Sequence, residues 1–599
     1  MQQEQLGQSV SLWMATAVPD RNALEEDAHA DVCIVGAGIA GITTAYLLAK
    51  ECKSVVVLDD GAVGGGQTQR TTAHLSNALD DRYYEIERLH GSQGAKLAAS
   101  SHTAAIDRIE SIVGEEQIAC DFVRLDGFLF LPPGESPELL DRELAAAHRA
   151  GLGGVERLAR APLACFDTGP CLRFPRQAQF HPLKYLTAVA GVIERAGGRI
   201  FTTAHAESIQ GGKPARVKTS SGRIVTADAV VVATNSPVND LLAIHTKQAA
   251  YTSYAIGAIV PRGAVATALY WDTSDPYHYV RIQPLSPEGS MTAQPGAEEH
   301  DVLIVGGEDH KTGQAPAHSD PYARLETWTR ERFPMIREVR FRWSGQVMET
   351  IDGLAFIGRN PLDQPNVFIV TGDSGMGMTH GTIAGILLTD LILGRENPWT
   401  TLYDPSRKTL GALDRFVKEN LNVARQYGDW LSGGDVASPA QIKAGTGAVI
   451  RHGLTKLAVY RDEQGTCHER SAVCTHLGGI VHWNDAEKTW DCPCHGSRFD
   501  RLGGVLSGPA NRDLGGADRA SAGSESLVNV TQQPLGKGVT IMGGKTDVVK
   551  GRVKEAAGVL TGNDMLREEG QTDQAVGKAK QAIQKAADTV KKAVKEVVE

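Results

Sequence analysis

The sequence lacks any segment suited to entering or crossing a membrane. Residues 1–27 contain no basic stretch followed by an apolar one, and no run in the chain approaches the roughly 20 apolar residues of a membrane span. An excess of positive charge is also missing, because 61 Lys and Arg stand against 71 Asp and Glu, giving a net charge of −10. We therefore expect a cytoplasmic protein with no nucleic-acid or membrane-surface partner.

Cysteine is scarce as well. Nine cysteines in 599 residues are too few for a disulfide framework, and only Cys474, Cys492 and Cys494 lie close together in the sequence. The others are expected to be small apolar side chains. Only one G-x-G-x-x-G motif follows a predicted strand, so a separate NAD(P)H-binding domain is not expected.

Residues 31–60, DVCIVGAGIAGITTAYLLAKECKSVVVLDD, read as a strand, a glycine turn, a helix and a second strand. Gly36 permits the tight bend, Gly38 lets the backbone approach a pyrophosphate, and Gly41 lets the helix pack close to the sheet. Asp59 ends the second strand, where a carboxylate accepts a hydrogen bond from a ribose hydroxyl. An ordinary glycine-rich turn is the alternative, and the motif alone does not separate NAD from FAD.

Two further segments favour FAD. GGGQTQRTTAHLS occupies residues 64–76, and residues 366–394 contain a second strand, glycine turn and helix. The turn GDSGMG alone is also typical of helix capping. Together with the first motif, residues 28–400 resemble the FAD-dependent oxidoreductases of the D-amino-acid oxidase family, which implies an FAD extended across the fold. The residues that the resemblance places beside the FAD are Arg70, Thr71, Gly372, Gly375, Gly377 and Met378.

A β-rich stretch between the two glycine motifs is expected to shape the substrate site. In YHYVRIQ, strand alternation places Tyr277, Tyr279 and Arg281 on one face. Arg281 is predicted to bind a substrate carboxylate, with a salt-bridged strand residue as the alternative. Tyr279 and His310 are further catalytic candidates, although His310 is also typical of a turn. His74 lies in the loop next to the flavin, and we expect a noncovalent FAD rather than a link to this histidine.

Cys474, His476, Cys492 and His495 have C-x-H and C-x-x-H spacing. Two Cys and two His also bind zinc, but zinc sites commonly open with C-x-x-C, whereas these ligands lie in glycine-rich loops. The flanking sequence resembles the Rieske family, which implies a [2Fe–2S] cluster with two thiolates on one iron and two imidazoles on the other. These four residues are the predicted metal ligands.

The cluster sequence departs from that of high-potential Rieske proteins in two ways. The resemblance places a disulfide in those proteins where this chain has Gly479 opposite Cys494, which leaves Cys494 unpaired. It also places a tyrosine where this chain has Phe499, whereas Ser497 remains as a hydroxyl donor to a sulfur. Because one hydrogen bond to the cluster is lost, we expect a midpoint potential below that of respiratory Rieske centres.

Residues from Lys545 onward contain neither an aromatic residue nor a cysteine and resemble the CsbD-like family, with a narrow apolar helical stripe. The expected fold class is multidomain, with an α/β FAD-binding Rossmann-like domain, an α+β substrate domain, an all-β Rieske domain and a helical tail. The predicted parts are an N-terminal extension (1–27), an oxidoreductase region (28–405) with its substrate subdomain within about 80–350, a helical linker (406–435), a Rieske domain (436–543) and a CsbD-like tail (544–599).

These resemblances imply an FAD-dependent dehydrogenase. The flavin would take a hydride from a carbon bearing an amine, and the substrate would be an amine or an amino-acid-like molecule. The cluster would then pass electrons singly to an external one-electron carrier. Two alternatives stay open: an oxidase whose cluster is a redox sensor or structural element, and a flavoprotein fed through the cluster by an external reductase.

Overall fold

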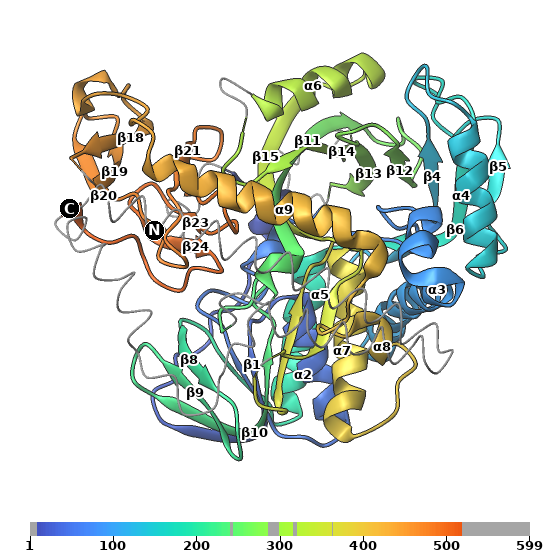
Figure 1. The fold of residues 1–599 in the computed structure, drawn as a ribbon. Coiled ribbons are helices and arrows are strands. Elements are labelled where there is room, and N and C mark those ends of the chain that lie inside the picture. The colour runs from blue at the N-terminus through green and yellow to red at the C-terminus, as the bar shows by residue number, and fades with distance from the viewer. Residues whose placement is uncertain are drawn as a thin grey trace, which may run out of the picture. The chain divides into compact units, whose positions relative to one another are not determined.

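The computed structural model describes residues 9–239, 244–285, 299–315, 320–361, 363–453 and 455–517. These residues divide into two compact units (Figure 1). The larger unit runs to Thr409 and includes Leu506–Asn511, and the smaller begins at Leu410. The CsbD-like tail predicted for residues 544–599 lies outside the described residues.

The larger unit contains a mainly parallel sheet. Its strands are β1 (Ala28–Val35), β2 (Val55–Leu58), β7 (Arg199–Phe201), β8 (Ala206–Gln210), β9 (Ala215–Thr219), β10 (Ile224–Val232), β16 (Phe356–Arg359) and β17 (Val367–Thr371). The order along its main path is β16-β17-β10-β1-β2-β7, in which β16 alone is antiparallel to its neighbour. The β8–β9 hairpin joins β10. Strand β2 and the carboxyl-terminal halves of β1 and β10 are apolar, because both faces of the sheet are covered there: one face packs against helices and the other against the β8–β9 hairpin.

A second sheet is mainly antiparallel. Its strands are β3 (His74–Leu75), β4 (Val123–Phe130), β5 (Glu156–Leu158), β6 (Cys171–Gln179), β11 (Gln248–Pro261), β12 (Leu269–Asp272), β13 (Tyr279–Pro284), β14 (His300–Lys311) and β15 (Glu338–Thr350). The order along its main path is β15-β11-β14-β13-β12-β4-β6-β3, and β5 pairs with β6. This sheet brings residues from widely separated parts of the chain side by side, including the loop that follows the first glycine motif.

Helices pack around the two sheets of this unit. They are α2 (Ile39–Lys50), α3 (Tyr83–Glu115), α4 (Glu138–Arg149), α5 (Pro182–Arg195), α6 (Pro321–Arg332), α7 (Gly377–Leu393) and α8 (Thr400–Tyr403), with 3-10 turns η1 (Leu12–Ala15), η2 (Gln67–Arg70) and η3 (His245–Lys247). Helices α2 and α7 lie side by side (Figure 1). A Cβ on Gly385 would stand 2.5 Å from Thr43 Cγ2, so glycine lets the two helices approach closely.

The smaller unit begins with a helix and continues as short strands. Its elements are η5 (Leu410–Ala412), α9 (Leu413–Gln426), η6 (Tyr427–Trp430), η7 (Pro439–Gln441), β18 (Thr446–His452), β19 (Thr455–Arg461), β20 (Cys467–Ser471), β21 (His482–Asn484), β22 (Thr489–Asp491), β23 (Arg498–Phe499) and β24 (Val505–Ser507), the last reaching into the segment grouped with the larger unit. Strands β18-β19-β20 form one antiparallel sheet and β21-β22-β23-β24 another.

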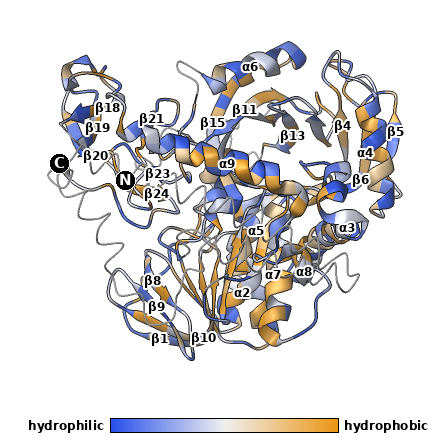
Figure 2. Ribbon diagram, in the orientation of Figure 1, coloured by the Kyte–Doolittle hydropathy of each residue, from blue (hydrophilic) through white to orange (hydrophobic). Residues whose placement is uncertain are grey.

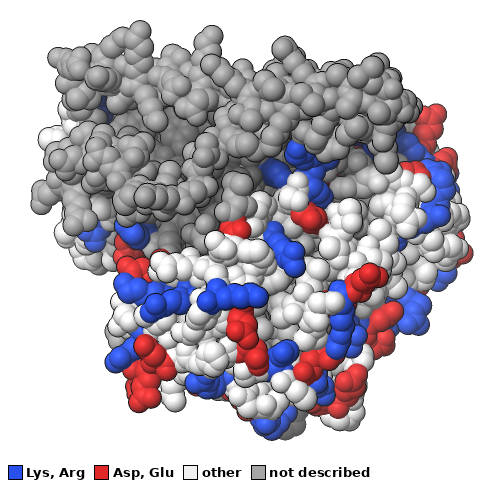
Figure 3. Space-filling view, turned by 60° about the horizontal axis from the view of Figure 1, so that its bottom comes forward, with Lys and Arg blue, Asp and Glu red and all other residues white. Residues whose placement is uncertain are grey.

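Apolar and charged residues are distributed differently. Figure 2 shows hydrophobic residues concentrated in β1, β10, α2 and α7, whereas hydrophobic and hydrophilic residues alternate along α9. On the face drawn in Figure 3, Lys and Arg are interspersed with Asp and Glu over the described surface. Among the described helices, none has the length and apolar character needed to traverse a bilayer.

Candidate functional site

The first glycine turn connects β1 to α2, and its glycine positions are too crowded for a side chain. Gly36 has φ +108°, and a Cβ there would stand 2.3 Å from the carbonyl oxygen of Ala233. A Cβ on Gly41 would stand 1.9 Å from the Gly36 carbonyl oxygen, and one on Gly38 would lie 3.1 Å from Thr68 Oγ1. The turn therefore brings bare backbone to the N-terminus of α2, as a pyrophosphate requires.

Asp59 lies directly after β2, beside this turn. Its carboxylate accepts hydrogen bonds from the N–H of Ala37 at 2.6 Å and of Gly61 at 2.8 Å. Burial, and then the neighbouring Asp60, raise the pKa of Asp59 to about 7. Its ribose contact stays a prediction, which its place at the carboxyl end of β2 supports.

The second glycine turn connects β17 to α7. Gly372 and Gly375 have φ values of +75° and +74°. A Cβ on Gly372 would stand 2.3 Å from Thr350 Cγ2, and one on Gly375 would stand 1.8 Å from Asp80 Oδ2. Gly377 begins α7 and the buried Met378 follows it. As in the first turn, the glycine positions Gly372 and Gly375 leave no space for a Cβ, so the turn presents bare backbone at these positions.

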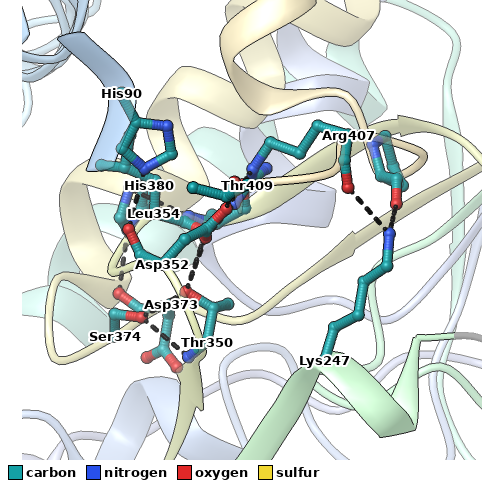
Figure 4. Close-up of polar contacts among 12 residues, drawn as sticks. His90, Lys247, Thr350, Asp352, Leu354, Asp373, Ser374, His380, Arg407 and Thr409 are labelled. Carbon is teal, nitrogen blue, oxygen red and sulfur yellow. Dashed lines mark hydrogen bonds and ion pairs between the residues drawn. The ribbon is translucent and has the colours of Figure 1, made fainter. Parts of the chain in front are cut away.

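A network of polar contacts holds the second turn against the neighbouring backbone and side chains (Figure 4). Ser374 Oγ accepts the N–H of Thr350 at 3.1 Å, and His380 Nδ1 bonds to the Asp373 carbonyl at 2.9 Å. The buried Asp352 carboxylate receives Arg407 Nε and Nη2 at 2.8 and 2.7 Å. Charge-assisted, two-point bonds of this kind fix geometry. The network therefore holds the turn in a defined shape.

The loop after η2 is anchored at its backbone. Arg70 Nη1 donates to Ser9 Oγ at 2.7 Å and to the Ser344 carbonyl at 2.9 Å. The indole N–H groups of Trp343 and Trp13 donate to the carbonyls of Arg70 and Thr71 at 2.8 and 2.7 Å. Because the Arg70 guanidinium makes these bonds, it ties the loop to the rest of the unit.

Aromatic residues at the start of β13 and just before it lie near this loop. The His74 ring meets Tyr279 edge-on at 5.7 Å between centroids, and Tyr279 lies 5.4 Å from Tyr277. The Tyr279 hydroxyl hydrogen-bonds Ser253 Oγ at 2.7 Å. Burial, and then the positive charge of Arg281, lower the pKa of His74 to about 3, so this histidine is neutral at physiological pH.

Arg281 lies on the same face of β13 but is completely buried. Its Nη1 donates to the carbonyls of Ala73, Thr72 and Phe180 at 2.9, 3.2 and 3.3 Å, and its Nη2 donates to Gln283. The salt bridge considered as an alternative role is not formed among the described residues. The guanidinium is instead surrounded by main-chain oxygens.

Four carboxyl groups converge from four separate segments. Asp80 precedes α3, Asp309 lies on β14, Glu349 lies on β15, and Asp373 lies in the second glycine turn. Asp80 accepts the Tyr277 hydroxyl at 2.9 Å. Burial raises the pKa of Asp80 and of Asp373 to about 6, that of Asp309 to about 7, and that of Glu349 well above its usual range. Within the described residues, none of the four forms an ion pair with Lys or Arg.

His310 lies next to Asp309 on β14. Its ring stacks on Tyr254, with 5.4 Å between centroids and 22° between planes. Its partner across the sheet is Thr252 on β11. His310 is therefore a strand residue stacked on an aromatic ring, not a turn residue. Its catalytic role stays a prediction.

In the smaller unit, two loops of the same shape carry the predicted metal ligands. The carbonyls of Cys474 and Cys492 each accept the N–H of the glycine four residues on, Gly478 or Gly496, at 3.0 Å. The N–H of each cysteine donates at 2.8 Å to the carbonyl five residues on. The two cysteines therefore occupy equivalent positions in the two loops, whereas His476 lies two residues after its cysteine and His495 lies three residues after its own.

The four predicted ligands form a cysteine pair and a histidine pair. The thiols of Cys474 and Cys492 hydrogen-bond each other, and Ser497 bonds to Cys474. The rings of His476 and His495 lie 5.1 Å apart at 84°. This donor set suits a [2Fe–2S] cluster, in which the thiolates and imidazoles bind different irons. Among the described residues, no group of three or more His, Cys, Asp or Glu is arranged to hold a single metal ion.

Cys494 lies beside Gly479. A Cβ on Gly479 would stand 2.6 Å from Cys494 Sγ and 3.2 Å from Cys492 Sγ, so the two loops are in contact at this point. All nine cysteines of the chain lie among the described residues and are free. The loops are therefore not tied by a disulfide.

Comparison with known proteins identifies the larger unit. A model of the FAD dependent oxidoreductase family matches residues 31–391, more than half of the chain. The chain belongs to the FAD-dependent oxidoreductases. A Rieske [2Fe-2S] domain model matches residues 434–520, and a CsbD-like model matches residues 541–592, which lie outside the described residues. These matches confirm the predicted families, their order, and FAD and a [2Fe–2S] cluster as cofactors of this oxidoreductase.

Individual relatives agree with this assignment. The oxidoreductase is 32% identical over 507 residues to a putative Rieske 2Fe-2S iron-sulfur protein, YhfW, of Bacillus subtilis, covering 84% of this chain and 96% of that protein. It is 27% identical to gamma-glutamylputrescine oxidoreductase of Escherichia coli, over 62% of this chain and 86% of the relative. Glycine oxidase from Geobacillus kaustophilus shares the fold, with a TM-score of 0.52, 18% identity, and coverage of 64% and 99%. The predicted fold class is confirmed.

Sequence reasoning missed the four carboxyl groups of this FAD-dependent oxidoreductase. Asp80, Asp309, Glu349 and Asp373 are spread over almost 300 residues and share no motif. The only local signal is that Asp373 lies inside GDSGMG and Asp309 lies beside the predicted His310. Their convergence depends on the pairing of β11, β14 and β15, which the sequence did not specify.

Proposed function

We propose that this FAD-dependent oxidoreductase is a dehydrogenase of cationic amines, whose electrons leave through the Rieske cluster to an external one-electron carrier. Bound FAD supplies a hydride acceptor for a CH–NH group, and the cluster supplies a one-electron centre. The observation that carries the substrate class is the convergence of four buried carboxyl groups beside the second glycine turn, none of which forms a salt bridge with Lys or Arg in the part of the chain that the structure describes.

The electrostatics favour a cation at this position. An unpaired charge is costly to hold away from water, and a cationic ligand removes that cost. The Asp80 carboxylate lies directly over Gly375, because a Cβ on Gly375 would overlap it, at 1.8 Å from Oδ2. A substrate ammonium about 4 Å from one carboxylate gains up to about 4 kcal/mol at an effective dielectric constant of 20. The carboxyl groups therefore select positive charge near the glycine turn.

Arg281 is the residue predicted to hold a substrate carboxylate, and we now propose a different role. Its Nη atoms bind the carbonyls of Thr72, Ala73 and Phe180, so they support the His74 loop. A guanidinium in this position orients backbone rather than a substrate. The proposed substrate is therefore recognised mainly through its positive charge.

Asp309 is the proposed proton acceptor. A protonated amine must lose a proton before hydride can leave its neighbouring carbon, and Asp309 Oδ1 has no hydrogen-bond partner among the described residues. Its pKa of about 7, raised by burial, suits a general base near neutral pH. Tyr279, held by Ser253, and the ring of Tyr277 are proposed to line the path to this carboxyl group. His310 lies behind Asp309, stacked on Tyr254.

The named relatives are compatible with this proposal. The Escherichia coli relative is an oxidoreductase of gamma-glutamylputrescine, an amine, and it covers most of the flavin region. The Bacillus subtilis relative covers both the flavin and Rieske regions of this chain. The first supports an amine as substrate class, and the second is compatible with a functional link between the two cofactors.

The experiment is an anaerobic substrate panel with the full chain. Diamines and polyamine derivatives are compared with sarcosine-like and D-amino acids, and flavin bleaching is followed for each. We expect bleaching by cationic amines without a carboxylate. Because a bound cation favours the ionised form of Glu349, which glutamine lacks, kcat/KM should fall at least about tenfold in Glu349→Gln.

Glu338→Gln is the matched control, because Glu338 lies on the same strand but pairs with Arg340 at the exposed surface. It should leave kcat/KM unchanged. A protein bleached only by amino acids, with Glu349→Gln behaving like Glu338→Gln, would contradict the proposed substrate class.

A further inference from the structure

The 3-10 turn η6, at the end of α9, contacts one of the two cluster loops. The Tyr427 hydroxyl donates to the Leu477 carbonyl at 2.8 Å, and the indole N–H of Trp430 donates to the Gly478 carbonyl at 2.9 Å. Two consecutive main-chain oxygens of the loop therefore receive donors from one four-residue turn.

The bonded carbonyls belong to the part of the loop that sets the position of a ligand. Leu477 and Gly478 directly follow the predicted iron ligand His476. Gly478 has φ +76°, in the left-handed region, and its N–H bonds back to the Cys474 carbonyl. Holding these carbonyls therefore restricts the backbone from which the His476 side chain extends.

A third contact extends this attachment. Asp429 Oδ2, in the same turn, lies 2.9 Å from Nε2 of His482, on the strand that follows the loop. Three of the four residues of η6 thus bind residues 477–482. Hydrogen bonds from one turn to the second half of a loop and to the strand that follows it limit the opening of that loop.

We propose that Tyr427 and Trp430 are positioning residues of the iron-sulfur site, so that the end of the predicted linker belongs functionally to the cluster. Their hydrogen bonds go to main-chain oxygens of the Cys474–Gly479 loop, and they act through this loop, which carries His476. The Rieske family model begins at residue 434, after both residues, so the family match does not include them. Because η6 follows α9 without a break, a displacement of this helix is transmitted to the loop.

The test uses full-chain Tyr427→Phe, Trp430→Phe and the double variant. The cluster midpoint potential and EPR spectrum are measured in a redox titration, and iron loss to excess chelator is timed. Iron loss should accelerate about fivefold for each lost hydrogen bond, and the effects should multiply in the double variant. The EPR spectrum should broaden and the potential should shift, because a looser His476 changes the ligation of its iron.

Tyr460→Phe is the matched control, since Tyr460 lies in the same unit and its hydroxyl forms no hydrogen bond among the described residues. It should keep the parent potential, spectrum and iron-loss rate, and all variants should keep their flavin. Parent-like cluster properties in Tyr427→Phe and Trp430→Phe would overturn the proposal. So would a lower thermal unfolding temperature with an unchanged spectrum and potential, because the residues would then be structural only.

Discussion

The ion pair beneath the second glycine turn gives a prediction that can be worked out in detail. Arg407 and Asp352 are 8% and 2% exposed at their side chains, and Arg407 also donates to the Ala355 carbonyl at 2.7 Å. Arg407→Leu leaves the Asp352 carboxylate buried without its cation. Breaking a buried pair in this way costs about 3–5 kcal/mol. The turn that forms part of the flavin cradle should loosen with it.

The assay is thermal unfolding of the purified protein together with its FAD content. Arg407→Leu should lower the unfolding temperature and the retained flavin, whereas Arg395→Leu, which breaks an exposed pair with Glu51, should change neither. Replacing both Arg407 and Asp352 with leucine should recover part of the stability, since no buried charge is then left alone. Equal effects of Arg407→Leu and Arg395→Leu would refute the reasoning.

The same pair predicts how stability depends on pH. The pKa of Asp352 lies below its usual value because the Arg407 charge and hydrogen bonds outweigh the effect of burial. A carboxyl whose pKa is lower in the folded state stabilises the fold above its unfolded pKa of about 3.9. That stabilisation is lost as pH falls through the lower folded value. Parent and Arg407→Leu proteins should therefore converge in stability in strong acid.

Three further outcomes follow from single residues. Gly36→Ala should purify with little FAD, because its Cβ meets a carbonyl oxygen at 2.3 Å, whereas Gly66→Ala, with nothing within 4 Å, should keep it; equal flavin content would exclude the first turn as the cradle. His495→Ala should abolish the Rieske EPR signal and leave the flavin spectrum intact, and a normal signal would remove it from the ligands. For a cationic amine, kcat/KM should rise as pH passes about 7, where Asp309 ionises, and this step should be missing in Asp309→Asn.

Features encoded in short segments could be predicted from the sequence. The glycines of the first turn, the four spaced cluster residues and the alternation along β13 each depend on neighbours within about 25 residues. In these cases backbone geometry is set locally, so Gly36 and Gly41 could be assigned roles without knowledge of the tertiary fold.

Features that depend on long-range pairing could not be predicted. Alternation placed Arg281 on the correct face of its strand, but its partners are carbonyls of Thr72 and Ala73, about 200 residues away. Likewise, only the tertiary fold brings Asp80 to Asp373. Tyr427 was part of a segment predicted as a linker, and no sequence pattern signals a bond to Leu477. Side-chain partners of this kind are determined by packing rather than by motif.

The most direct measurement of the central claim is an anaerobic titration of the full chain with a cationic amine, with flavin absorbance and cluster EPR recorded on the same samples. If the protein is a dehydrogenase connected to its Rieske domain, flavin absorbance falls and the signal of the reduced cluster then grows. If the flavin bleaches while the cluster stays oxidised, electrons do not pass between the two cofactors. That result would contradict the proposed function and favour an oxidase whose cluster has a sensing or structural role.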